Sequence, residues 1–255
     1  MKKKIRIGTL ISGGGTNLQA IIDGCYNGDI DGQILFTGSD VPGVKGLERA
    51  QRAGIDTFIV DYRQIINNAR ENPLSMVLPD DFNIEEIRAK QRIIKSNIDF
   101  FLKTRAMAEQ ALLDHILPYK IDLLVLAGFM RTLTPYFIDR INISYYNIND
   151  DTSSPCKIVE GKSKLIKLRI MNIHPALLPA FPGTDGYGDT FRYGCKVGGS
   201  TVHYVDYGED TGPIIGQRAF QIEDGDTLEI VKQKGLELEW KLYPECIQKF
   251  AMGIV

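Results

Sequence analysis

The stretch IRIGTLISGGGTNLQAII, residues 5–22, decides the fold of this chain. Residues 5–12 form a mostly apolar run without polar alternation, which is typical of a strand covered on both faces of a sheet. Glycines 13–15 then lead into a segment of helix-forming residues. A strand, a glycine turn and a helix in this order predict the first βα unit of an α/β protein.

The same alternation continues along the chain. Further apolar runs at 33–39, 56–62 and 121–129 predict strands, and residues 17–26 and 46–54 predict helices between them. Such an order favours a mostly parallel sheet with helices on both faces. Residues 200–207 and 214–224 are strand-like and joined by a short turn, so the C-terminal part of the sheet is predicted to be antiparallel. The segment 227–251 predicts a helix that packs back over the sheet.

We predict one domain over residues 1–255, with two insertions. The first, at about 63–104, is expected to be helical, because Asn83 and Glu86 are placed as an N-terminal capping pair. Apolar residues also recur there at helical spacing, namely Ile84, Ile87, Ile94, Ile98 and Phe101. The second, at about 141–166, combines turn-forming residues with scattered charge and predicts a hairpin or a loop.

Composition excludes several classes of function. The formal net charge of −2 over 255 residues gives no field that would gather nucleic acid or an anionic membrane. No stretch approaches the roughly 20 apolar residues that span a bilayer. The cysteines lie far apart, which argues against a zinc ribbon or a disulfide framework, and the three histidines indicate no metal cluster. We therefore predict a cytoplasmic protein with reduced thiols, no metal, and neither nucleic acid nor membrane as a partner.

The glycine turn is a candidate anion site. Glycines let the backbone approach a ligand, and the N-terminus of the following helix presents N–H groups to a phosphate. Thr16 and Asn17 add a hydroxyl and an amide. Leu18 stands where a dinucleotide fingerprint needs its third glycine, so the pattern favours a phosphomonoester over NAD. The alternative is an ordinary tight turn between a strand and a helix.

A second candidate site lies in MNIHPALLPAFPG, residues 171–183. Asn172 and His174 are two positions apart, so on a strand they point to the same side. Together they could hydrogen-bond a carbonyl oxygen and exchange a proton with it, whereas the alternative is a buried histidine with a structural partner. Asp210 could hold His174 protonated for general acid chemistry, or it could be the Asx-turn residue before Thr211. Spacing alone leaves both alternatives open.

Five ordered motifs carry a family resemblance: ISGGGTNLQAII, GLERAQRAGI, VLAGFMRTL, NIHPALLPAFPG and STVHYVDYGEDTGPII. In this order they resemble the folate-dependent phosphoribosylglycinamide formyltransferases, over most of the chain outside 63–104 and 141–166. The resemblance implies a Rossmann-like formyltransferase sheet. It also implies transfer of a formyl group from 10-formyltetrahydrofolate, as co-substrate, to the amine of glycinamide ribonucleotide. A monomer or a homodimer is expected, and no metal is required.

The resemblance also implies roles for individual residues. The catalytic set falls on Asn172, His174 and Asp210, with His203 in support. The substrate phosphate falls on Gly15, Thr16 and Asn17, and Glu239 holds the ribose hydroxyls. The folate falls on the 126–133 segment and, near its glutamate tail, on an arginine; these residues are Leu126, Phe129, Met130, Arg131, Thr132, Leu133 and Arg105.

The sequence departs from the family pattern beside the catalytic pair. Ala176 stands where serine is common, and residues 183–194, GTDGYGDTFRYG, lack a histidine and an alanine that usually follow this glycine. They offer Asp185, Tyr187 and Asp189 instead. Because this segment lies near the acceptor in the family, a formyltransferase acting on another amine, such as an amino sugar, stays an alternative.

Two further alternatives use the same donor motifs. A formyltetrahydrofolate hydrolase would deliver water with the same three catalytic residues, but it usually carries an N-terminal regulatory domain, and here the first strand begins at residue 5. A binding protein that has lost catalysis is expected to lose one of Asn172, His174 and Asp210, and all three are present.

Overall fold

The computed structural model describes residues 4–93, 95–143, 157–158, 165–166 and 168–255. Its main sheet has the strand order β3-β2-β1-β4-β7-β8-β9, in which β3 to β7 are parallel and β8 and β9 are antiparallel to their neighbours. The predicted fold class is therefore confirmed. The strands are β1 (Ile5–Ile11), β2 (Gly32–Ser39), β3 (Asp56–Ile59), β4 (Leu123–Leu126), β7 (Ile170–His174), β8 (Val197–Tyr204) and β9 (Ile214–Gln221).

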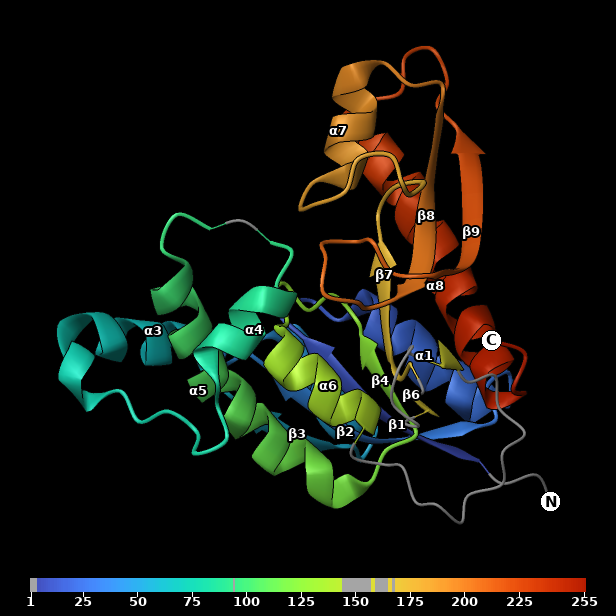
Figure 1. The fold of residues 1–255 in the computed structure, drawn as a ribbon. Helices are drawn as coiled ribbons and strands as arrows, with labels where there is room; N and C mark the ends of the chain where they lie inside the picture. The colour runs from blue at the N-terminus through green and yellow to red at the C-terminus, as the bar shows by residue number, and fades with distance from the viewer. Residues whose placement is uncertain (1–3, 94, 144–156, 159–164, 167) are drawn as a thin grey trace.

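Helices cover both faces of the sheet (Figure 1). One core packs beneath α1 (Thr16–Asn27), α2 (Lys45–Arg52) and α8 (Leu228–Ala251). The other packs beneath α3 (Tyr62–Glu71), α4 (Ile84–Lys90), α5 (Ile98–Ile116) and α6 (Pro135–Ile143). The short helix α7 (Gly186–Tyr193) lies against α8 and β8, beyond the parallel strands (Figure 1). The described residues also form two single 3₁₀ turns, η1 (Pro73–Ser75) and η2 (Leu117–Tyr119).

Several strands end earlier than the sequence predicts; the strand predicted over 200–207 ends at Tyr204, and the one predicted over 214–224 ends at Gln221. The third predicted strand, 56–62, ends at Ile59, because the Asp61 side chain accepts a hydrogen bond from Gln64 N at 2.9 Å and caps α3. The fourth, 121–129, ends at Leu126, and Gly128 then adopts a left-handed conformation that turns the chain. In both places a turn-forming residue overrides the apolar run.

The segment 63–104, predicted as an insertion, is mostly helical, but it does not form one helix. Asn83 caps α4 as predicted, since its side chain accepts from Glu85 N at 3.1 Å and Glu86 N at 3.2 Å. However, α4 ends at Lys90, and α5 starts afresh at Ile98, where the Asn97 side chain accepts from Phe100 N at 3.1 Å. An asparagine favours the beginning of a helix over its interior. Ile94, part of the predicted spacing, lies outside the described residues.

The insertion at 141–166 is described only in part. Residues 141–143 belong to α6, so the added segment begins later than predicted. Strand β5 (Lys157–Ile158) pairs antiparallel with β6 (Leu165–Ile166), which agrees with the hairpin alternative for those residues. The rest of this prediction falls on 144–156 and 159–164, outside the described residues. Among the described helices, none is both long enough and apolar enough to cross a membrane.

Candidate active site

Strand β7 brings an amide and an imidazole to the carboxyl end of the parallel strands. Met171 and Ile173 point into the core beneath α8. Because side chains alternate along a strand, Asn172 and His174 both point to the opposite side, as predicted. In an open α/β sheet this end of the strands is where ligands bind.

His203 on β8 supports the amide of Asn172. Antiparallel pairing sets the two residues opposite each other, with Asn172 Nδ2 at 3.2 Å from His203 Nε2. His203 Nδ1–H donates to the Tyr204 carbonyl at 2.8 Å, so the neutral ring presents Nε2 as an acceptor to Asn172. An amide nitrogen carries two hydrogens, and Asn172 therefore keeps a second N–H with which it can donate to a ligand.

His174 is held at both ring nitrogens. Nδ1 lies 3.1 Å from Asp210 Oδ2, and Nε2 lies 2.7 Å from the carbonyl oxygen of Phe181. Both partners are acceptors, so a protonated His174 satisfies both contacts by donating twice. The side chain is only 3% exposed, and this geometry fixes the plane of the ring. His174 is therefore not simply a buried histidine with one structural partner.

Asp210 joins the two histidines. Its carboxylate contacts His174, lies 3.5 Å from His203 Nε2, and accepts from Gly183 N at 2.9 Å. Burial acts to raise the pKa of Asp210, but the adjacent His203 ring, the hydrogen bond from Gly183 N and the charge of His174 outweigh it, so this pKa lies below its usual value. A backbone φ of 54° aims the side chain at the site, in a region that aspartate tolerates.

The lowered pKa of Asp210 makes the stability of the fold depend on pH in the acid range. A lowered pKa in the folded state means that Asp210 stabilises the fold above its unfolded pKa of about 3.9, and that this stabilisation is lost as the pH falls through the folded value. We expect the free energy of unfolding of Asp210→Asn to fall less between pH 5 and pH 3 than that of the wild type. Urea titrations at a series of pH values would measure it, and parallel curves would contradict it.

The turn in this loop is made by a neighbouring aspartate and not by Asp210. Asp206 accepts from Gly208 N at 3.0 Å and from Thr211 Oγ1 at 2.6 Å, so it organises the turn. Asp210 is left to face the histidines. The sequence offers both aspartates in the same loop, and only the folded register distinguishes their roles.

The prolines and glycine after His174 fold the chain back over it. Thr201 Oγ1 accepts from Leu178 N at 3.0 Å, and Gln217 Nε2 donates to Leu178 O at 2.8 Å, which ties this loop to β8 and β9. As a result the Phe181 carbonyl reaches His174 and the Gly183 N–H reaches Asp210. Sequence reasoning missed these two groups because both are main-chain atoms.

The three catalytic candidates share a cavity of about 210 Å³ with the predicted folate segment. Asn172, His174 and Asp210 line it from one side. The end of β4 and the segment that follows it line it from the other, through Leu126, Phe129, Met130, Arg131, Thr132 and Leu133. The structure therefore brings together six of the seven residues predicted to contact folate.

Arg105, the seventh, lies behind this cavity. Its guanidinium is 4.9 Å from the centre of the Tyr62 ring, and that of Arg131 is 5.4 Å from the same ring. Arg105 is only 9% exposed, and burial lowers the pKa of its guanidinium. Arg131, by contrast, lines the cavity and pairs with the carboxylate of Asp40. Arg105 thus reaches the folate segment through Tyr62.

Polar side chains that the sequence analysis missed hold this segment in place. Ser12 Oγ accepts from Met130 N at 2.8 Å, and Glu109 accepts from Thr134 N at 2.8 Å. Burial raises the pKa of Glu109 to about 7, against the opposing effect of its hydrogen bonds from Thr134. Ser12 and Glu109 are distant in the sequence from the residues that they hold, so no local pattern predicts this role.

The backbone of the glycine turn packs closely against α2, and the N–H groups at the start of α1 have no side-chain cap. Gly15 has a φ of 70°, and a Cβ on it would lie 2.7 Å from Gly46 Cα. Gly46 N in turn donates to Gly13 O at 3.1 Å. Helix α1 has no side-chain cap and no acidic residue in its first turn. Its N-terminal N–H groups can therefore bind an anion.

Asn17 and Glu239 meet although 222 residues separate them. Asn17 Nδ2 donates to Glu239 Oε2 at 2.7 Å, so the amide points inward and not towards solvent. Tyr187 Oη donates to the other carboxylate oxygen at 2.6 Å. Burial raises the pKa of Glu239, and the hydrogen bonds from Tyr187 and Asn17 oppose that rise. Asn17 is therefore placed to contact a phosphate with its main-chain N–H only.

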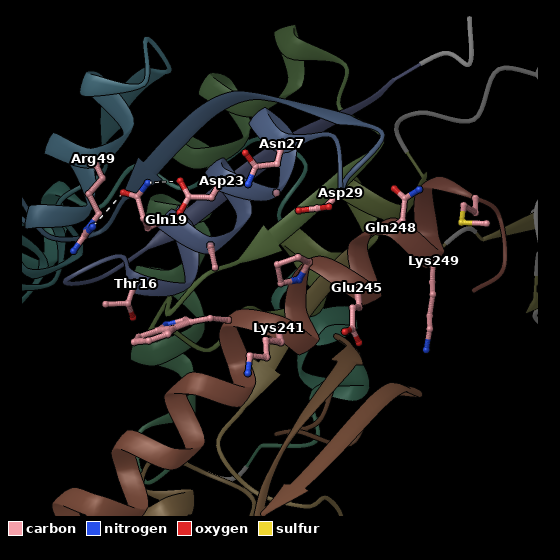
Figure 2. A pocket seen from close by; sticks show the side chains of 15 residues that line it. Thr16, Gln19, Asp23, Asn27, Asp29, Arg49, Lys241, Glu245, Gln248 and Lys249 are labelled. Atoms are coloured by element: carbon pink, nitrogen blue, oxygen red, sulfur yellow. Dashed lines mark hydrogen bonds between the residues drawn. The ribbon is translucent and has the colours of Figure 1, made fainter.

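A larger cavity of about 870 Å³ lies between α1 and α8, with Thr16 and Arg49 at one end (Figure 2). Arg49 Nε donates to Gly14 O at 3.0 Å, and Nη1 donates to Gln19 Oε1 at 3.1 Å. Its positive charge thus lies beside the glycine turn, a feature that the helix prediction for 46–54 did not include. This cavity is lined by none of the three catalytic candidates, so we assign the chemistry to the smaller one.

An amide and an imidazole at the end of β7, with a carboxylate from the loop between β8 and β9 against them, can stabilise a charged oxygen and move a proton, as group-transfer enzymes do. The chain belongs to the formyl transferase family, whose model matches residues 5–150 and 162–247. It is 32% identical to phosphoribosylglycinamide formyltransferase of Bacillus subtilis (strain 168), covering 93% of this chain and 90% of the relative. It is 30% identical to the enzyme of the same name from Escherichia coli (strain K12), covering 98% and 88%.

Solved structures agree with these relatives. The crystal structure of glycinamide ribonucleotide transformylase 1 from Symbiobacterium toebii has a TM-score of 0.71 and 34% sequence identity, covering 99% of this chain and 90% of that one. Within its family, the chain thus falls with the phosphoribosylglycinamide formyltransferases. Among the described residues, no group of three or more His, Cys, Asp or Glu side chains could hold a metal ion.

Proposed function

We propose that the chain transfers the formyl group of 10-formyltetrahydrofolate to the amine of glycinamide ribonucleotide in purine biosynthesis. The observation that carries this proposal is the position of Asp210. Its carboxylate contacts His174 and His203 in the cavity that Asn172 and the predicted folate segment also line. This arrangement can stabilise an oxyanion and move a proton at one place.

Asn172 and His174 would stabilise the negative charge that develops on the formyl oxygen as the amine attacks. Asn172 has a second N–H to donate, and the Phe181 carbonyl holds His174 Nε2, so we expect the His174 Nδ1–H that contacts Asp210 to be shared with this oxygen when substrate binds. A preorganised donor of this kind contributes roughly 3 kcal/mol to stabilisation of the transition state. Both donors are in place before substrate binds.

Asp210 would keep His174 protonated and accept the proton of the attacking amine, directly or through a water. When the tetrahedral intermediate collapses, the bond between the formyl carbon and N10 breaks, and this proton passes to N10 of the leaving tetrahydrofolate. Its pKa lies below the usual value, so it is ionised at neutral pH. Proton transfer by a positioned group contributes about 10²- to 10⁴-fold in rate. The Gly183 N–H fixes the carboxylate for this task.

The acceptor would lie between the glycine turn and α8. Its phosphate would bind the N–H groups of Gly15, Thr16 and Asn17, with the charge of Arg49 nearby, and its ribose hydroxyls would donate to Glu239. The folate would lie against the 126–133 segment. Arg105 remains a prediction for the region of the glutamate tail, because its guanidinium packs over Tyr62.

Tetrahydrofolate formation from 10-formyltetrahydrofolate, with and without glycinamide ribonucleotide, tests the proposal. We expect turnover only when the ribonucleotide is present. Turnover without it would mean a hydrolase, and turnover only with another amine would redirect the acceptor. A cytoplasmic location and a monomeric or homodimeric state are part of this proposal.

The glycine turn makes a separate prediction about the acceptor. Glycinamide ribonucleoside, which lacks the phosphate, should bind at least about 100-fold more weakly than the ribonucleotide, because it forgoes several charge-assisted hydrogen bonds. Calorimetric titration of both ligands measures the difference, with 10-formyltetrahydrofolate as the control ligand. Equal affinities would remove the phosphate from residues 15–17.

A further inference from the structure

Tyr187 stands in the segment that departs from the family pattern, and its hydroxyl is buried. It lies near the start of α7 and is 6% exposed. Its Oη is 2.6 Å from Glu239 Oε1 and 2.7 Å from Ser200 Oγ, and Ser200 is fully buried. The side chain therefore connects α7 and β8 to the carboxylate on α8.

The chemistry of the groups fixes the direction of each hydrogen bond. A carboxylate only accepts, so Tyr187 gives its single proton to Glu239, and Ser200 must donate to the phenol oxygen. Asn17 Nδ2 donates to the second carboxylate oxygen at 2.7 Å. Each oxygen of Glu239 thus has one fixed donor, and each has further acceptor capacity for a ligand.

Helix α8 is shaped around this tyrosine. Gly235 lies four residues before Glu239, on the same face of the helix. A Cβ on Gly235 would come within 2.2 Å of Tyr187 Cζ, so the aromatic ring fills the space that the missing side chain leaves. The Tyr187 ring packs against one turn of α8, at Gly235, and the Glu239 carboxylate projects from the next turn on the same face. The position of Tyr187 is therefore determined by packing as well as by hydrogen bonding.

We infer that Tyr187 is a positioning residue for Glu239, holding the carboxylate so that it accepts from the vicinal hydroxyls of a ribose. This inference rests on the proposed function, in which Glu239 receives the ribose of the acceptor. It also assigns a task to part of the altered 183–194 segment: Tyr187 sets selectivity for an acceptor that carries a ribose diol.

The test is Tyr187→Phe, which keeps the ring against Gly235 and removes the hydroxyl. We expect the KM for glycinamide ribonucleotide to rise about 10- to 100-fold, because a carboxylate that Tyr187 no longer holds loses about one charge-assisted hydrogen bond to the ribose. The kcat should stay within about threefold, because the hydroxyl contacts no reacting atom. The KM for 10-formyltetrahydrofolate should not change. Tyr26→Phe, at a residue that is 91% exposed, is the matched control.

A double-mutant cycle separates positioning from a structural role. If Tyr187 acts through Glu239, then Tyr187→Phe should add little to the acceptor KM of Glu239→Gln. Additive effects, an acceptor KM within twofold of wild type in Tyr187→Phe, or an equal rise in both KM values would each overturn the inference. Wild-type protein without activity towards the ribonucleotide would instead overturn the proposed function, and this inference with it.

Discussion

Asp210→Asn is expected to lower kcat by about 10²- to 10⁴-fold while leaving the affinity for both substrates nearly unchanged. Asparagine has almost the same size, so the loop held by Asp206 can keep its shape. It carries no negative charge, however, and cannot hold His174 protonated or accept the proton of the amine. The loss therefore falls on the chemical step, and single-turnover kinetics with saturating substrates would measure it.

Asp224→Asn is the matched control, because that carboxylate is 96% exposed and pairs only at the surface with Lys196. It should leave kcat unchanged. A kcat within threefold of wild type for Asp210→Asn would remove this carboxylate from the mechanism. A large loss accompanied by weak ribonucleotide binding would mean that the loop moved, and melting temperatures of the two variants would distinguish that outcome.

The fold was largely predictable because its signals are local. Continuous apolar runs that end in glycine turns predict strands covered on both faces, and they can be recognised without knowing which strands pair. Where prediction failed, a single capping or turn-forming residue competed with the apolar spacing. Asp61 ends one strand early by capping α3, and Asn97 starts a new helix inside the insertion.

The site was predictable only as far as its motifs were contiguous. Asn172 and His174 share one strand, so their common direction follows from the alternation of side chains. The choice between the two roles of Asp210 required the folded structure, in which its loop places it against both histidines. The partners of Glu239 depend on contacts across most of the chain, and the Phe181 carbonyl has no side-chain signal at all.

His174→Ala is expected to lower kcat by about 10³- to 10⁴-fold, because it removes both the oxyanion donor and the partner of Asp210. The ribonucleotide should still bind with nearly wild-type affinity, since its phosphate and ribose contacts lie on α1 and α8. Calorimetry for binding and stopped-flow kinetics for turnover would separate the two effects. A weak catalyst that still binds the ribonucleotide would place His174 in the chemical step.

Because His174 is buried, His174→Ala can also lose stability, so a second variant is needed to isolate the effect on the chemical step. Removal of the ring leaves Asp210 as a buried carboxylate with one partner fewer, which costs stability. His174→Asn retains a hydrogen-bond donor without the basic nitrogen, so it should fold better and yet stay at least about 100-fold below wild type in kcat. His115→Ala, which removes an exposed ring stacked on Phe58, controls for loss of a histidine elsewhere. If His174→Asn and His115→Ala have equal rates, the donor to the formyl oxygen must be another group, and His203 beside Asn172 would be the next candidate.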